Sequence, residues 1–279
     1  MKKQILVIGG TGKTGSRVAQ ILKTEGHQVR IGGRNESPSF DWSKPESYGS
    51  ALEGMEAAYV TYYPDLAVPG AKEAITRLTL AAKSAGLKKL VLLSGKGEKE
   101  AEACERIVVR SGLDYVLVRA SWFNQNFSES FLLEPIQAGQ VALPMAEAQI
   151  PFVDANDIAE VAVKALTEDQ WNGRTLTVTG PEKLTFKQVV EEIASVTDRS
   201  IQFQSVSVEA YGEMMKSAGV PDDYVWLFSY LFREVLGNAD NQEISYDVKE
   251  VLGRNATSFR EYIERTADTG IWNQMVSSI

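Results

Sequence analysis

The chain has 279 residues, of which 44% are hydrophobic, and carries a formal net charge of −8. This is enough for one large domain or a domain with an appendage, and the acidic balance argues against nucleic-acid partners and anionic membranes, which need clustered Lys and Arg. The single cysteine, Cys104, leaves no internal disulfide, and no apolar run reaches the length of a signal-peptide core or membrane span, so we expect a cytoplasmic protein.

Strand-like and helix-like segments alternate along the first half of the chain. The predicted strands are 4–8, 28–32, 58–61, 89–94 and 114–119. The helices between them are predicted at 13–24, 45–52, 70–84 and 98–111. This alternation is typical of parallel strands joined by crossover helices. We therefore predict an α/β fold with a Rossmann-like, doubly wound parallel sheet.

The alternation breaks after about residue 120. Later predicted elements are a helix at 157–166, a strand at 175–179 and a helix at 185–197, and beyond residue 200 the chain looks mostly helical. We predict a Rossmann domain over 1–150 and a smaller, mostly helical part over 151–279, with some of its segments returning to the sheet. Ligands of doubly wound sheets lie across the carboxyl ends of the strands, so the second part is expected to cover a substrate.

The first predicted strand runs into a glycine-rich turn at the start of a helix. From Gly9 to Gly15 the sequence is Gly-Gly-Thr-Gly-Lys-Thr-Gly. The glycines allow a sharp exit from the strand, a close approach of backbone to a ligand, and tight packing of the helix on the sheet. Unpaired N–H groups and a positive dipole end at the helix N-terminus favour the pyrophosphate of a dinucleotide.

Two alternatives compete with dinucleotide binding at this turn. Gly12-Lys13-Thr14 resembles the end of the phosphate loop of nucleoside triphosphatases, but that motif requires glycine at position 7, where Val7 lies inside the strand. The other alternative is a glycine turn with no ligand. The amphipathic helix and second strand that follow complete a βαβ unit and favour the dinucleotide.

The residues after the second predicted strand bear on the choice of dinucleotide. Sites for NAD usually place Asp or Glu there, to accept hydrogen bonds from the ribose hydroxyls. This chain has Arg34, whose guanidinium suits a 2′-phosphate, and Lys13 is a second candidate cation. Glu36 is the alternative if the loop is shifted. We predict NADP(H) in preference to NAD(H), and no metal.

The usual acid of short-chain dehydrogenases is missing. In those enzymes a Tyr-x-x-x-Lys pair donates a proton, but no tyrosine of this chain has a lysine four residues later. Ser94 does stand at a strand end, followed by Lys96. The single histidine, His27, is interpreted as a solvated turn residue, which excludes a Ser-His-Asp triad.

An ordered set of motifs extends over nearly the whole chain. Its members are the 9–15 turn, Arg34, Leu92-Leu93-Ser94, Glu105 before Ser111-Gly112-Leu113, Arg119-Ala120-Ser121-Trp122-Phe123-x-x-Asn126-Phe127, Ile150-Pro151-Phe152-Val153, Asp157-Ile158-Ala159, and Thr179-Gly180-Pro181 with Leu184-Thr185. This set resembles the NmrA-like atypical short-chain dehydrogenase/reductases. Within them it is most similar to the ergot-alkaloid reductases of the festuclavine-synthase and agroclavine-dehydrogenase type.

The resemblance implies a set of site residues. NADP(H) would be held by Gly9, Thr11, Gly12, Lys13, Thr14, Gly15 and Arg34, with Ser94 and the 121–126 loop near the nicotinamide. Trp122 and Phe123 follow the carboxyl end of a strand, and with Asn126 they are the candidates for the substrate pocket.

The chain departs from the family pattern at two positions. Ala120 replaces a proline, and Ala101 stands where related reductases have a lysine. These departures argue against a lysine-assisted carbonyl reduction. Ser94 and Lys96 remain the candidates for a catalytic role.

A missing general acid still permits hydride transfer to some acceptors. An iminium becomes a neutral amine, and a quinone becomes an anion stabilised by its ring, whereas a simple ketone needs a proton donor. We therefore predict an NADPH-dependent reductase for a small aromatic or conjugated acceptor, iminium or quinone-like, in which positioning supplies most of the catalysis.

Two other functions stay open at this point. A non-catalytic redox sensor, which would bind NADP(H) and regulate a protein partner, fits the missing Tyr-x-x-x-Lys pair equally well. A sugar epimerase or dehydratase is less favoured, because its chemistry relies on the absent tyrosine. Large apolar residues of the C-terminal half, such as Trp226 and Phe232, are either core or pocket walls. The sequence leaves the substrate and the oligomeric state open.

Overall fold

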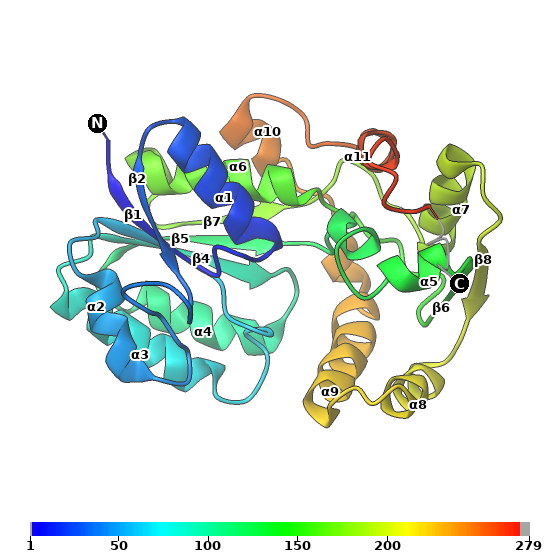
Figure 1. Ribbon diagram of the computed structural model, residues 1–279, viewed down its shortest axis with the longest axis horizontal. Helices are drawn as coiled ribbons and strands as arrows, with labels where there is room; N and C mark the ends of the chain where they lie inside the picture. The colour runs from blue at the N-terminus through cyan, green and yellow to red at the C-terminus, as the bar shows by residue number, and fades with distance from the viewer. Residues whose placement is uncertain (1, 274–279) are drawn as a thin grey trace. The chain divides into compact units, whose positions relative to one another are not determined.

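The computed structural model describes residues 2–273, which divide into two compact units (Figure 1). Within the described residues, the first unit comprises 2–120, 155–178 and 246–254, and the second comprises 121–154, 179–245 and 255–273. The units therefore alternate along the chain. Each is described separately below.

A six-stranded parallel sheet forms the centre of the first unit, in the order β2-β1-β3-β4-β5-β7. Its strands are β1 (Gln4–Ile8), β2 (Gln28–Gly32), β3 (Ala57–Val60), β4 (Lys89–Gly95), β5 (Asp114–Ala120) and β7 (Arg174–Val178). β1 and β3 are almost fully buried and nearly continuous in apolar residues, as expected of strands covered on both faces. The strand order reverses between β1 and β3, and ligands of doubly wound sheets bind at such switch points.

Helices cover both faces of this sheet (Figure 1). They are α1 (Lys13–Thr24), α2 (Tyr48–Leu52), α3 (Ala71–Ser84), α4 (Lys99–Val109), α6 (Ala155–Thr167) and α10 (Asp247–Leu252). On one face α1 packs beside α6, and on the other α3 packs beside α4. Aliphatic side chains such as Leu6, Ile75 and Leu90 form the buried core under α2, α3 and α4. The predicted doubly wound Rossmann-like fold is confirmed.

Two segments return to the first unit after the chain has left it at Ala120. One supplies α6 and then β7, which pairs in parallel with β5. The other supplies α10, which packs against α6 and β7. The predicted organisation included later segments that return to the sheet, but the chain leaves the first unit at Ala120 and not at residue 150. The sequence shows the change of rhythm near residue 120, but pairing of β7 with β5 is decided by tertiary contacts.

The second unit is mostly helical. Its helices are α5 (Leu133–Gln137), α7 (Phe186–Thr197), α8 (Val208–Ser217), α9 (Asp222–Tyr230) and α11 (Phe259–Ala267), and a π-helical segment (Leu231–Leu236) follows α9. β6 (Gln140–Leu143) and β8 (Gln202–Ser205) form a two-stranded parallel sheet. These strands were not predicted, because each is short and has polar residues rather than a continuous apolar run, as in Gln202–Ser205. Phe127, Phe186 and Phe232 are fully buried in the aromatic core.

The structure also gives information on three features considered from the sequence: membrane spans, metal sites and the single histidine. In residues 2–273 no helix has both the length and the hydropathy that a membrane crossing requires. No three His, Cys, Asp or Glu side chains of this described region are grouped as a metal site. His27 was wrongly interpreted as solvated, because its side chain is only 8% exposed. The amide of Lys3, the residue before β1, donates to its Nδ1 at 3.1 Å.

Candidate functional site

The glycine-rich turn joins β1 to α1 at the switch point of the sheet. Gly9 has φ of +77°, in the left-handed region that glycine favours. The Gly12 amide donates to the Gly9 carbonyl at 2.9 Å and closes the turn just before the helix. Thr11 and Gly12 are exposed, so the backbone at the tip of the turn is accessible to a ligand.

Gly15 lets the helix lie directly against this turn. A Cβ at position 15 would lie 2.2 Å from the Gly9 carbonyl oxygen and 3.1 Å from the Gly10 Cα. The first turn of α1 contains no acidic residue, so nothing within that turn neutralises the positive end of the helix. The first N–H groups of a helix also lack intrahelical acceptors. An exposed glycine turn at such a helix end fits the pyrophosphate of a dinucleotide.

Two side chains, Tyr59 of β3 and Thr61 just after it, hydrogen-bond to the residues on either side of the turn. The Tyr59 hydroxyl donates to Thr14 Oγ1 at 3.0 Å, and both groups are buried. Thr61 Oγ1 donates to the Ile8 carbonyl at 3.1 Å. The hydroxyl of Thr14 therefore accepts a bond from the sheet, and its own proton, like its backbone amide, remains a donor that a phosphate could use.

The loop after β2 carries both residues considered for the ribose. Arg34 and Glu36 are exposed. The Glu36 amide donates to the Gly33 carbonyl at 3.3 Å, and a Cβ at Gly33 would lie 3.4 Å from Glu36 Cγ. The Arg34 charge also helps to lower the pKa of Asp41, after the hydrogen bonds that Asp41 accepts from Ser43. A cation and a carboxylate thus share one exposed turn.

The two catalytic candidates lie at the end of β4. Ser94 is 5% exposed, and its Oγ has no hydrogen-bond partner among the described residues. Lys96 is half-buried, and its amide donates to the Ala120 carbonyl at 2.9 Å, which links this turn to the end of β5.

The same turn brings in a carboxyl pair that was not predicted. Glu98 is 8% exposed and hydrogen-bonds to Asp65, which lies in the loop after β3. Burial, reinforced by the Asp65 charge, raises the pKa of Glu98 well above its usual range. Burial also raises the pKa of Asp65. The only sign of this pair in the sequence is that an acidic residue follows each of the two strands.

The predicted pocket residues belong to the second unit. Trp122 is half-buried and packs against Phe186 and Phe232, with ring centroids 5.5 and 5.4 Å apart. Phe123 forms an isolated parallel bridge with Val153. Asn126 is half-buried, and its carbonyl accepts from the Leu132 amide at 3.2 Å.

Asn124 is a second residue that the sequence did not single out. It is fully buried, and neither its Oδ1 nor its Nδ2 has a partner within residues 2–273. Its backbone amide donates to the Val153 carbonyl at 2.8 Å. A buried amide without partners is unfavourable by about 1–3 kcal/mol, and such groups typically mark a position that a ligand or ordered water completes.

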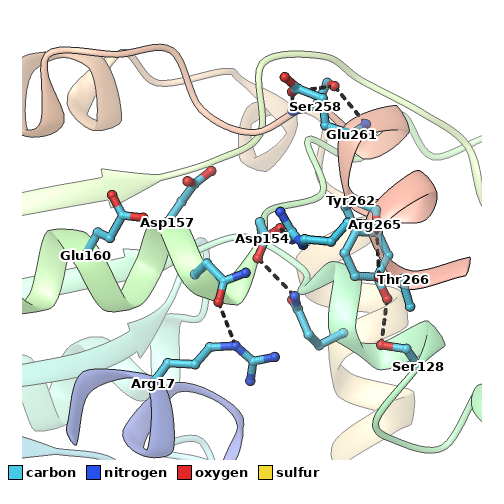
Figure 2. A network of polar contacts seen from close by, with 12 residues as sticks. Arg17, Ser128, Asp154, Asp157, Glu160, Ser258, Glu261, Tyr262, Arg265 and Thr266 are labelled. Carbon is cyan, nitrogen blue, oxygen red and sulfur yellow. Dashed lines mark hydrogen bonds and ion pairs between the residues drawn. The ribbon is translucent and has the colours of Figure 1, made fainter. Parts of the chain in front are cut away.

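A polar network holds the 121–128 segment in the second unit (Figure 2). Gln125 Nε2 donates to the buried Asp154 at 2.9 Å, and Asp154 also pairs with Arg265 of α11. The Tyr262 hydroxyl donates to Ser128 Oγ at 2.7 Å. These contacts fix the backbone that carries the candidate pocket residues.

Comparison with known proteins identifies the family. The model of the NmrA-like family matches residues 1–264. The chain belongs to the NmrA-like family. The resemblance deduced from the motifs is thereby confirmed.

Individual NmrA-like relatives align over nearly the whole chain. The uncharacterized oxidoreductase YesF of Bacillus subtilis (strain 168) is 29% identical, and the alignment covers 98% of this chain and 100% of YesF. Agroclavine dehydrogenase of Claviceps fusiformis is 28% identical over 93% of this chain and 96% of its own. An NADPH-dependent quinone oxidoreductase from Escherichia coli, solved with NADPH, superposes with a TM-score of 0.74 at 20% identity, covering 94% of this chain and 99% of that one. At that identity the last likeness shows the fold alone.

These NmrA-like relatives bear on the predicted function. They confirm the prediction of an oxidoreductase at the level of enzyme class. The acceptor, the choice between NADP(H) and NAD(H), and the individual site residues stay predictions.

The two positions at which the sequence departs from the expected pattern, Ala101 and Ala120, are both buried. Ala120 is the last residue of β5 and is 5% exposed, and Ala101 is fully buried in the core under α4. Glu105 lies one helical turn further and is bound by Arg119 of β5, whose Nε donates to its two carboxylate oxygens at 2.9 and 3.1 Å. The bond from Glu105 is also the main cause that raises the pKa of Arg119. Arg119 is therefore committed to an ion pair.

Proposed function

We propose that this NmrA-like protein is an NADPH-dependent reductase that transfers hydride to a small aromatic or conjugated acceptor, either an iminium or a quinone. The observation that carries the proposal is the exposed glycine turn at the β1–β3 switch point, closed tightly against α1 by Gly15. Arg34 is the first charged residue after β2, ahead of Glu36 in the same exposed turn. The charge of Arg34 favours a 2′-phosphate.

The roles of the site residues follow from this proposal. The cofactor, when bound, supplies the hydride. The backbone of Gly9, Thr11, Gly12, Lys13, Thr14 and Gly15 would hold the pyrophosphate, Arg34 the 2′-phosphate, Ser94 the nicotinamide end, and Trp122, Phe123 and Asn126 the acceptor. Binding both reactants in the correct geometry supplies most of the rate enhancement.

Iminium and quinone acceptors fit the side chains present better than simple ketones do. The lysine position of related reductases is filled by the buried Ala101, and the guanidinium of Arg119 is bound to Glu105. No tyrosine is followed by a lysine four residues later. The names of two similar proteins, agroclavine dehydrogenase and NADPH-dependent quinone oxidoreductase, support acceptors of these classes.

Titration with NADPH and NADH tests the cofactor assignment. In Arg34→Ala we expect NADPH affinity to fall about 10- to 100-fold, which corresponds to about 1.4–2.7 kcal/mol, because the charged hydrogen bonds to the 2′-phosphate are lost. NADH affinity should not change. Arg110→Ala, at an exposed arginine after α4, is the matched control and should bind both as the wild type does. Equal affinities for NADPH and NADH, unaffected by Arg34→Ala, would overturn the assignment.

An acceptor screen tests the reaction. Loss of reduced-nicotinamide absorbance should be seen with quinones and iminium compounds, and much less with simple ketones. If NADPH binds tightly but no acceptor consumes it, the reductase is wrong. The redox-sensor alternative would then be tested by asking whether NADP⁺ and NADPH differ in their effect on a protein partner.

A further inference from the structure

Two hydrogen-bonded carboxyl groups lie at the carboxyl edge of the first unit's sheet. Asp65 follows β3 and Glu98 follows β4, and these two strands pair directly in parallel. Their side chains hydrogen-bond to each other. An ionised carboxylate only accepts hydrogen bonds, so a bond between two carboxyl groups requires that one of them carries a proton. The pair therefore holds a proton.

The surroundings place this proton on Glu98. Glu98 is 8% exposed, and burial disfavours its charged form first, followed by the charge of Asp65. Asp65 is half-buried, and its Oδ1 accepts from the Ala67 amide at 2.8 Å, which stabilises its charged form. The charge of Glu105 also acts against ionisation of Glu98. Burial raises the pKa of Asp65 as well, but less than that of Glu98, so Asp65 is the more readily ionised and more solvent-accessible member.

Other titratable groups surround the pair. The charge of Glu105 on α4 acts on Glu98, and Glu105 is itself bound by Arg119 of β5. Cys104, also on α4, is influenced by the charge of Asp65 and by those of Lys72 and Glu73 on α3. Burial raises the pKa of the Cys104 thiol to about 11, so it stays neutral. The charges around Glu98 are therefore mainly negative or already paired.

Two buried side-chain oxygens, one at the end of β4 and one in the turn after it, lack a hydrogen-bond partner among the described residues. They are Ser94 Oγ and Glu98 Oε2. Unpaired buried oxygens are rare in native structures. Gly95 lies between these residues, and a Cβ there would be 1.7 Å from Glu98 Oε1. The glycine therefore allows the Glu98 carboxyl to lie against the end of the strand.

We propose that Glu98, supported by Asp65, donates the proton in quinone reduction, in place of the absent Tyr-x-x-x-Lys acid. This inference rests on the proposed function. The hydride leaves the reduced nicotinamide with its electron pair and adds to the quinone, which becomes a hydroquinone anion. The O–H bond of Glu98 breaks, and its proton binds the anionic oxygen to give the hydroquinone. One proton taken up from the solvent, relayed by Asp65, restores the O–H bond of Glu98, so that each turnover consumes one hydride and one solvent proton.

Reduction of an iminium acceptor by the same protein is a control for the role of the Glu98 proton. The iminium takes the hydride and becomes a neutral amine, so it consumes no proton from Glu98. Loss of the Glu98 proton should therefore slow quinone reduction and leave iminium reduction unchanged. A purely structural role for Glu98 predicts equal losses with both acceptors.

The central experiment compares Glu98→Gln with Glu102→Gln, a control on the same helix. With a quinone we expect Glu98→Gln to lower kcat about 100-fold, in the range of general acid catalysis, with KM unchanged. With an iminium acceptor its kcat should equal that of the wild type. Glu102→Gln should match the wild type with both. Equal slowing of both acceptors by Glu98→Gln, or no slowing with the quinone, would overturn the proposal.

A second variant tests the role of Asp65. In Asp65→Asn the negative charge that raises the pKa of Glu98 is removed. The pH above which the rate of quinone reduction falls should therefore be lower than in the wild type. The rate of iminium reduction should keep its wild-type pH dependence. An unchanged quinone profile would contradict the pairing, and this variant also serves if Glu98→Gln does not fold.

Infrared spectroscopy of the cofactor-free protein gives a measurement independent of activity. The carbonyl stretch of a protonated carboxyl group should be present at neutral pH in the wild type and in Glu102→Gln, and lost in Glu98→Gln. Its absence from the wild type would overturn the inference. Wild-type protein that reduces neither acceptor would overturn both the function and this inference, whereas quinone reduction unaffected by Glu98→Gln would overturn this inference alone.

Discussion

The turns after β1 and β4 leave the same edge of one parallel sheet, yet they have opposite chemistry. Each connects a strand to a helix. The glycine-rich turn after β1 is exposed at Thr11 and Gly12, and the first turn of α1 has no acidic residue. The turn after β4 ends in the buried Glu98, and the first turn of α4 adds Glu100 and Glu102. One helix end is left open for an anion, whereas the other is filled by acidic side chains.

This difference shows what decides the function of a strand end. Both helices have the same dipole and the same unpaired N–H groups. The residues of the turn and of the first helical turn decide whether an external anion can approach. The β1 turn is suited to binding phosphate, and the β4 turn is suited to holding a proton.

Gly15→Ala should have the largest effect, because it blocks the open turn. Its Cβ would meet backbone atoms of Gly9 and Gly10, which cannot rotate away as a side chain can. We expect a loss of about 1–3 kcal/mol in stability and a 10- to 100-fold loss of NADPH affinity as the turn shifts. Isothermal titration and urea unfolding measure the two effects.

Gly49→Ala is the matched control for that substitution. A Cβ at position 49, in α2, has no heavy atom within 4 Å outside its own helix and neighbours. Alanine is also the better helix former, so stability should be unchanged or raised by up to about 1 kcal/mol. If the two variants bind NADPH equally well, close approach at Gly15 is not what shapes the site.

Glu105→Gln tests the β4 side of the comparison, where the buried carboxylate of Glu105 on α4 is bound by Arg119. Glu105 has a side chain 3% exposed, and Arg119 beside it is 30% exposed. Removing the negative charge leaves the guanidinium partly buried without its partner, so we expect a loss of about 3 kcal/mol in the free energy of unfolding. Urea unfolding at neutral pH measures it.

Glu102→Gln is the control, because Glu102 approaches the same guanidinium only to 3.7 Å and is 40% exposed. Exposed pairs of this kind contribute about 0–1 kcal/mol. A loss as large as that of Glu105→Gln would show that burial does not distinguish the two carboxylates.

The two turns also differ in how far the sequence could predict them. The β1 turn is local: strand, glycines and helix are contiguous, so Gly9 to Gly15 could be identified without any tertiary information. The pair of Asp65 and Glu98 exists only because β3 and β4 lie side by side in the sheet. Neither residue stands out in its own segment.

The same reasoning explains the other differences between sequence and structure. β6 and β8 are short strands far apart in the chain, and only their pairing gives them their conformation. The burial of Asn124 depends on the packing of the second unit around it. Local hydrophobic patterns predicted β1 and β3 closely, because these strands are nearly continuous apolar runs covered on both faces.

The pH dependence of stability tests the proton of the β4 turn. A carboxyl whose pKa is raised in the folded state binds more protons folded than unfolded, so its contribution is full at low pH and is lost as pH rises through the folded pKa. Burial raises the pKa of Glu98 in this way. Above the unfolded Glu value of about 4.3, wild-type stability should fall by up to about 1.4 kcal/mol per pH unit until the folded pKa is passed. Thermal unfolding of Glu98→Gln across the same pH range should lack this decline, and parallel curves for the two proteins would contradict a proton held by Glu98.

Tyr59→Phe should have the smallest effect. It tests which group of Thr14, in the turn after β1, contacts the cofactor. The Tyr59 hydroxyl donates to Thr14 Oγ1 at 3.0 Å inside the core, and burial raises its pKa, so it stays a neutral donor. Losing this bond should lower stability by about 1 kcal/mol, measured by urea unfolding. NADPH affinity should not change if Thr14 serves the cofactor through its backbone amide. Thr14→Val removes the hydroxyl itself, and if it weakens NADPH binding where Tyr59→Phe does not, that hydroxyl contacts the cofactor and the turn binds phosphate with more than its backbone.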